Sequence, residues 1–99
     1  MARDEMLAVL RDACTFIMRS DNDFSWCDWH GPADAQAELQ RLIETLERGV
    51  VPPRLDLSIL FAPTGPLQEL SMSSGWGKEF LQLANRFDAA EGRLYEEAR

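Results

Sequence analysis

Apolar residues recur every three or four positions in three parts of the chain, the spacing at which they share one face of an α-helix. The first part predicts a helix over residues 3–19, which the polar run SDND at residues 20–23 ends. The second predicts a helix that begins near Pro32, a residue suited to a first helical turn, and ends at Gly49 as a C-cap. The third predicts a last helix that follows the sequence SSGWG at residues 73–77.

The region between the second and the last of these helices alternates apolar and polar residues instead. Residues 55–61 and 67–74 each show the period of a half-buried strand, and the turn-forming sequence PTGP separates them. Pairing the two runs across this loop sets Ile59 opposite Leu70, so that the large alternating residues share one face. The pattern therefore predicts an antiparallel hairpin whose apolar face is covered by helices.

These elements predict a single α+β domain over residues 1–99, with three helices packed on a two- or three-stranded antiparallel sheet in the order α-(β)-α-β-β-α. The optional third strand is DFSWC at residues 23–27, in which Phe24 and Trp26 would point to the same face. The expected core consists of Leu10, Ile17, Trp26, Leu42, Leu46, Leu57, Ile59, Leu70, Met72, Phe80 and Phe87.

The charge balance bears on location and partners. The chain has 17 acids and 10 bases, a net charge of −7, which disfavours direct binding to nucleic acid but suits a basic protein partner. No stretch approaches the roughly 18 consecutive apolar residues of a membrane span, and the N-terminal residues do not read as a signal peptide. We therefore expect a cytoplasmic protein that does not act at a membrane, with Cys14 and Cys27 as reduced thiols.

The sequence DFSWCDWHG at residues 23–31 holds the residue types most often used in catalysis. Cys27 and His30 are three residues apart, where a histidine could activate a thiol or share a metal with it. A zinc site needs three or four protein ligands, and Cys14 lies on the apolar stripe of the first helix. The chain also lacks a phosphate loop and a G-x-S-x-G nucleophile motif. We therefore expect a packing role for this segment, with no catalytic residue, metal or cofactor, and keep a minor enzymatic role of Cys27 and His30 as an alternative.

The hairpin tip and the turn after it carry the candidate binding surface. Glycines and prolines give a rigid backbone there, Gly65 could supply a positive φ, and tryptophan is the residue type most enriched at interface hot spots. The candidate binding residues are Thr64, Gly65, Pro66, Gln68, Trp76 and Gly77. The function that this surface favours is that of a small acidic protein-binding module, regulatory or immunity-like and without catalysis. The alternative is a small-molecule sensor that uses the same aromatic residues to line a pocket.

Self-association is a further expectation from the predicted sheet. An exposed sheet edge leaves backbone groups unpaired, and pairing of two edges across a two-fold axis would form a homodimer. Such pairing would also bury Leu60 and Leu67, which the hairpin register leaves as spare apolar residues.

Two segments, FSWCDW at residues 24–29 and residues 60–88, resemble a group of small uncharacterised bacterial proteins, and the likeness extends over roughly two thirds of the chain. The resemblance implies a bacterial cytoplasmic protein. It implies no activity, cofactor or functional residue.

Overall fold

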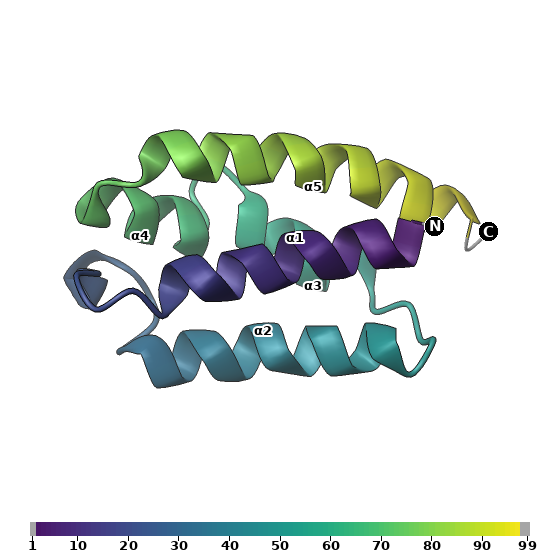
Figure 1. Ribbon diagram of the computed structural model, residues 1–99, viewed down its shortest axis with the longest axis horizontal. Coiled ribbons are helices and arrows are strands. Elements are labelled where there is room, and N and C mark those ends of the chain that lie inside the picture. Colours follow the sequence, from purple (N-terminus) through teal and green to yellow (C-terminus); the bar gives the residue numbers. More distant parts are fainter. Residues whose placement is uncertain (1, 98–99) are drawn as a thin grey trace.

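The computed structural model describes residues 2–97, and within that range the chain is helical with no β-strand (Figure 1). The α-helices, with one 3-10 helix η1, are α1 (Ala2–Ile17), η1 (Phe24–Trp26), α2 (Pro32–Glu47), α3 (Arg54–Phe61), α4 (Pro66–Ser74) and α5 (Gly77–Glu97). The predicted α+β class is therefore wrong, and this is an all-helical domain. Over the same residues, no helix combines the length and apolar character that a membrane-spanning segment requires.

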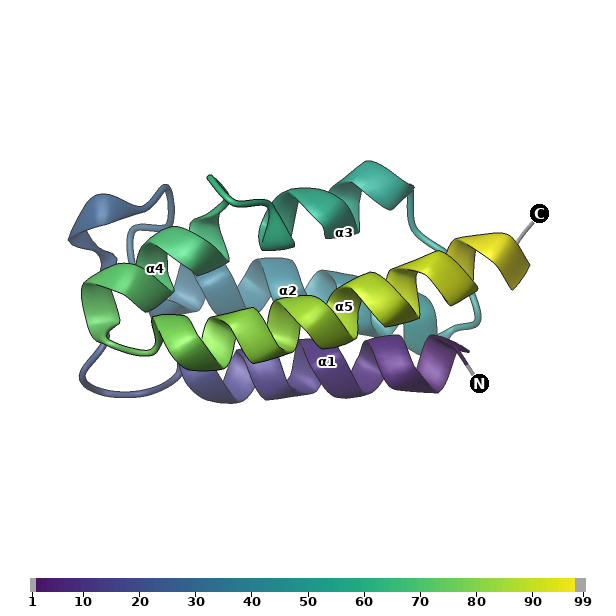
Figure 2. The ribbon, with the colours of Figure 1, turned by 90° about the horizontal axis from the view of Figure 1, so that it is seen from above.

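The long helices α1, α2 and α5 run side by side, with α1 between the other two (Figure 1). The short helix α4 packs on α5, and α3 packs on both α4 and α5. Figure 2 shows α3 and η1 standing on the same side of the molecule, the side turned away from α1. The two segments predicted as strands, α3 and α4, thus form a helical cover over the three-helix layer.

The helices predicted from 3.6-residue periodicity are confirmed. Helix α2 begins at Pro32 and ends just before Gly49, whose φ of 80° is the left-handed conformation typical of a C-cap glycine. Helix α1 ends at Ile17, two residues before its predicted end. The expected apolar stripe of α5 is buried at Phe80, Leu83, Phe87 and Leu94.

Residues 55–61 form a helix because their apolar residues satisfy the helical period as well as the alternating one. Leu57, Leu60 and Phe61 stand at positions i, i+3 and i+4, and all three are buried. Leu55 and Ile59, which the strand pattern placed with Leu57, are 70% and 51% exposed. The expected core position of Ile59 is therefore wrong, because a helix turns it away from Leu57 by more than a quarter of a turn.

Residues 66–74 form a helix for the same reason. Leu67, Leu70 and Ser71 are buried at helical spacing, while Met72, an expected core residue, is 69% exposed. The buried Ser71 hydroxyl donates to the carbonyl oxygen of Gln68 at 2.7 Å, so no polar group is stranded by this arrangement. Gly75 ends the helix with a φ of 84°.

Without a sheet among residues 2–97, the predicted homodimer has no edge to pair through. Leu60 and Leu67, the residues that edge pairing was expected to bury, are already fully buried inside the single chain.

The predicted strand at residues 23–27 is instead the 3-10 turn η1. Its start is capped by Asp23, whose side chain accepts a hydrogen bond from the Ser25 amide at 2.9 Å. Trp26 is 72% exposed, which contradicts its expected core position, and the buried tryptophans are Trp29 and Trp76. The other expected core residues are buried: Leu10, Ile17, Leu42, Leu46, Leu57, Leu70, Phe80 and Phe87.

Substitutions on α3 distinguish the helix from the strand. Leu57→Ala should lower the free energy of unfolding by about 2–5 kcal/mol, because it opens a cavity in the core. Ile59→Ala should lower it by less than about 1 kcal/mol, since half of that side chain is already in water. Urea unfolding followed by circular dichroism measures both, and equal losses would contradict the helical assignment.

Candidate functional site

The loop between α1 and α2 is held on the rest of the fold by Trp76. The indole of Trp76 stacks on Phe16 with ring centroids 5.0 Å apart, and its Nε1 donates to Asn22 Oδ1 at 2.8 Å. Asn22 in turn donates from Nδ2 to the carbonyl oxygen of Phe16 at 2.8 Å. Because Trp76 is only 1% exposed, it is a core residue that ties the loop to the α4–α5 turn and presents no surface to a partner.

A second set of hydrogen bonds fixes the loop to the end of α4. The Ser73 hydroxyl donates to the carbonyl oxygen of Asp23 at 2.8 Å, and the Asp23 amide donates to Ser74 Oγ at 2.9 Å. The main-chain N–H and C=O groups of Asp23 thus both have hydrogen-bond partners at the C-terminal end of α4. The loop is consequently fastened beside α4 from Asn22 onward.

At its far end the same loop is fastened to α2. The buried Trp29 donates from Nε1 to Glu38 Oε2 at 2.8 Å, and the His30 amide donates to Asp34 Oδ2 at 3.1 Å. These contacts turn the Trp29 side chain inward, between α2 and the segment that joins α3 to α4.

A hollow of about 470 Å³ opens beside Trp29, and we call it the Trp29 hollow. Three of the predicted binding residues contribute to it together with residues from α2, α3 and the loop. Its lining consists of Asp28, Trp29, Glu38, Ile59, Ala62, Thr64, Gly65 and Pro66.

The remaining predicted binding residues lie elsewhere. Gln68 and Gly77 line a smaller hollow of about 210 Å³ between α4 and α5, next to the exposed side chains of Met72 and Leu81. The structure therefore divides the six predicted residues among the Trp29 hollow, the α4–α5 hollow and, for Trp76, the core.

Two other hollows, of about 210 and 250 Å³, follow the contact between α1 and α5. Each is lined by an arginine and a carboxylate that form an ion pair, Arg86 with Asp12 and Arg93 with Glu5. The charges of these two pairs are matched within the chain, and Glu79 also lines the hollow beside Arg86 and Asp12.

Gly65 shapes the wall of the Trp29 hollow through close approach. Its φ is −82°, so the expected positive φ is not the reason for glycine here. A Cβ at this position would lie 2.4 Å from the carbonyl oxygen of Ile59, which is main chain and cannot swing away. Glycine therefore permits the α3 and α4 backbones to meet closely at the rim of the hollow.

The hollow lies at the edge of the most acidic part of the chain. Residues 20–40 contain five of the 17 acids, Asp21, Asp23, Asp28, Asp34 and Glu38, and no lysine or arginine. Asp28 and Glu38 line the hollow, and among the ion pairs of residues 2–97 neither has a basic partner. This excess of acids could have been read from the sequence, and the packing role expected for the segment holds for Trp29, which is buried.

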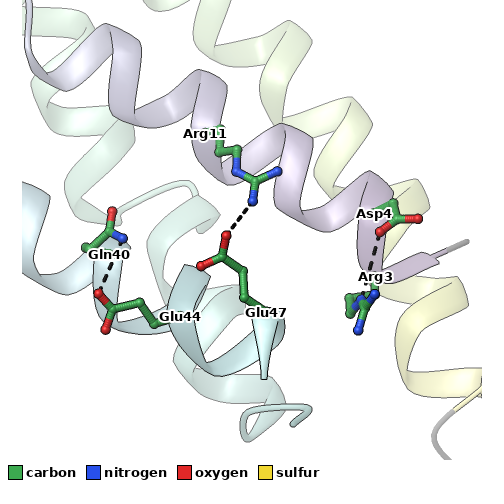
Figure 3. Close-up of polar contacts among 6 residues, drawn as sticks. All are labelled: Arg3, Asp4, Arg11, Gln40, Glu44 and Glu47. Carbon is green, nitrogen blue, oxygen red and sulfur yellow. Dashed lines mark hydrogen bonds and ion pairs between the residues drawn. The ribbon is translucent and has the colours of Figure 1, made fainter. Parts of the chain in front are cut away.

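Elsewhere several arginines pair with carboxylates of another helix. Figure 3 shows Arg11 of α1 reaching Glu47 of α2, with nitrogen and oxygen 2.7 Å apart. In the same view Gln40 donates to Glu44 along α2. The charge of the bundle is thus largely balanced locally, and the excess of acid is concentrated in the loop and the start of α2.

Among residues 2–97, the hydrogen bonds of Cys27 and His30 go to other partners and none joins the two. The Cys27 thiol lies 3.6 Å from the carbonyl oxygens of Phe24 and Trp29, to which it can donate. Burial is the main cause that raises the pKa of this thiol, and the nearby carboxylates of Glu69, Asp28 and Asp23 add to it. A raised pKa disfavours the thiolate that nucleophilic catalysis needs.

Within residues 2–97, no group of three or more histidine, cysteine, aspartate or glutamate side chains is placed to hold a metal ion. Cys14 and Cys27 are both free thiols, as the sequence predicts.

Comparisons with protein families, with curated proteins and with solved structures found no match to this chain.

Two glycine variants test the close approach at the hollow. Gly65→Ala should lower the free energy of unfolding by about 1–3 kcal/mol, because its methyl group collides with main chain. Gly92→Ala is the matched control: a Cβ there meets nothing within 4 Å, so alanine in helix α5 should stabilise by about 0.5–1 kcal/mol. Thermal and urea unfolding of both variants measures the difference, and a Gly65→Ala protein as stable as the wild type would contradict the packing.

Alkylation of Cys27 tests the electrostatics of the loop. In a Cys14→Ser background, the pH midpoint of alkylation should lie higher in the native protein than in the same chain unfolded in urea, because the folded thiol pKa is raised. A native midpoint below the unfolded one would instead favour the enzymatic alternative for Cys27 and His30.

Proposed function

We propose that this protein is a small acidic, non-catalytic binding module that recognises a protein partner through its α3 face. The α3 face consists of the exposed apolar side of α3, formed by Leu55 and Ile59, together with the Trp29 hollow. What carries the proposal is that the exposed apolar side of a short helix continues directly into a hollow, since Ile59 belongs to both.

Leu55 and Ile59 are among the large apolar side chains that stay exposed in the structure. Helix α3 has only eight residues, and it already buries Leu57, Leu60 and Phe61 against the core. On its other side, Leu55 and Ile59 leave most of their apolar area in water, at 70% and 51% exposure. Contiguous exposed apolar surface of this kind is typical of interaction sites.

A neighbouring aromatic side chain extends the same side of the molecule. The 3-10 turn η1 carries Trp26, the most exposed of the large apolar side chains, and stands on the same side as α3 (Figure 2). An exposed tryptophan on the same side of the molecule as α3 supports recognition of a protein surface, because tryptophan is enriched at interface hot spots.

The cytoplasm is the proposed compartment. The support is that Cys14 and Cys27 are both unpaired thiols, as is usual in reducing surroundings.

A small-molecule sensor is the second candidate function. The Trp29 hollow, at about 470 Å³, falls within the range of about 300–1,000 Å³ typical of ligand pockets, and it combines an indole with two carboxylates. This candidate needs only the hollow, whereas protein recognition also needs Leu55 and the open side of α3.

Matched polar substitutions test the proposed function. Ile59→Asn lies on the α3 face and Leu81→Asn on α5 beside the other hollow, and both side chains are more than half exposed, so both variants should fold. A partner captured from a bacterial lysate by the wild type should bind the Ile59→Asn protein at least about tenfold more weakly and the Leu81→Asn protein unchanged. Titration with the recovered partner measures both affinities. Equal affinities for the wild type and Ile59→Asn, or no partner at any salt concentration, would contradict recognition of a protein through this face.

A further inference from the structure

The α3 face presents an apolar strip that leads into the Trp29 hollow. Leu55 and Ile59 are four residues apart on α3, which separates them by about 6 Å along the helix axis. Beyond Ile59 the apolar strip continues into the hollow through Ala62 and Pro66. Such a strip matches the side chains that an amphipathic helix presents at positions i, i+3, i+4 and i+7.

The two ends of this strip differ in charge. At the hollow end, Asp28 and Glu38 have no ion-pair partner among residues 2–97. The Trp29 indole that donates to Glu38 is neutral, so the negative charge of Glu38 is not cancelled. At the start of α3, Arg41 and Arg54 are present, but Asp56 and Glu91 pair with them. The negative charge that is available to a partner is therefore at the hollow end.

Further acids lie close to that end. Asp23 and Glu69 act with Asp28 on the Cys27 thiol and raise its pKa, so their fields overlap in the loop beside the hollow. No lysine or arginine lies within residues 20–40 to offset them, so this part of the molecule attracts a cation.

We infer that the occupant of the α3 face is a basic amphipathic helix of a partner protein, with its apolar side on Leu55 and Ile59 and its lysines or arginines over Asp28 and Glu38. The inference rests on the function proposed above and adds the chemistry of the partner. A helix is favoured over an extended strand because the face has no sheet edge, within residues 2–97, for a strand to join.

A second copy of this chain does not fit the same face. Each copy carries a net charge of −7, and two α3 faces brought together would place the unpaired carboxylates of Asp28 and Glu38 in one interface. Uncompensated like charges in an interface oppose association.

Synthetic peptides test the inference with a defined probe. A helical peptide of leucines and lysines, blocked at both ends, should move the indole signals of Trp26 and Trp29 and the Gly65 amide signal in nitrogen–proton spectra. The Trp76 indole, hydrogen-bonded in the core, should not move. The same peptide with glutamate in place of lysine should bind at least about tenfold more weakly.

Two charge variants show whether the attraction is local. Asp28→Asn/Glu38→Gln should weaken the lysine peptide by about tenfold, and glutamine can still accept the hydrogen bond from Trp29. Asp88→Asn/Glu96→Gln removes the same charge from exposed positions on α5 and should weaken it by less than about twofold. Equal weakening by the two pairs would overturn the inference, because the attraction would then belong to the net charge.

The remaining outcomes separate this inference from the proposed function. Equal binding of the glutamate peptide at the same signals would overturn the basic partner and leave protein recognition by the α3 face intact. Spermidine that moves the Trp29 signal as tightly as the peptide would show a site for small cations and overturn the helix. Movement of these signals with protein concentration alone would identify a second copy as the occupant and also overturn it. If no peptide moves them while the captured partner still discriminates Ile59→Asn, the inference fails and the proposed function stands.

Discussion

The contacts of the buried Trp76 indole are the interactions on which the rest of the structure depends. The indole stacks on Phe16 at the end of α1, donates a hydrogen bond to Asn22 of the loop, and lies at the junction of α4 and α5. With the loop fastened there and along α4 by Ser73 and Ser74, Trp29 reaches α2 and forms one wall of the hollow. The core contacts of Trp76 at one end of the loop thus help to position Trp29 and the hollow at its other end.

The same loop explains why negative charge accumulates beside that surface. The acids of the loop and of the start of α2 have structural tasks: Asp23 caps η1, Asp34 accepts from the His30 amide, and Glu38 accepts from Trp29. Each task uses a neutral donor, which satisfies a hydrogen bond without cancelling the charge. In the helical bundle, by contrast, arginines meet carboxylates across the helix contacts. The segregation of charge therefore follows from how the loop is held, and it favours a cationic partner.

The long helices could be predicted because sixteen or more residues display several helical turns, whereas α3 and α4 are only eight and nine residues long. In so short a run, the leucines at 55 and 57 suggest the alternating pattern of a strand. Only Leu60 departs from that alternation and indicates the helical period. Trp26 was expected in the core and is exposed, whereas Trp76 was expected to bind a partner and is buried; this exchange depends on the path of the loop, which no local pattern encodes. Thr64, Gly65 and Pro66 were predicted as binding residues and do line the hollow. Glu38 was not, since only the tertiary fold brings it there.

The environments of the three indole groups test this account most directly, because each tryptophan has a distinct role. In nitrogen–proton spectra of the free protein, the indole protons of Trp76 and Trp29 should exchange slowly with water and show nuclear Overhauser contacts to Asn22 and to Glu38, respectively. The Trp26 indole proton should exchange rapidly, since that side chain is 72% exposed. A protected Trp26 together with a rapidly exchanging Trp76 would contradict the fastening of the loop and, with it, the surface that the loop helps to form.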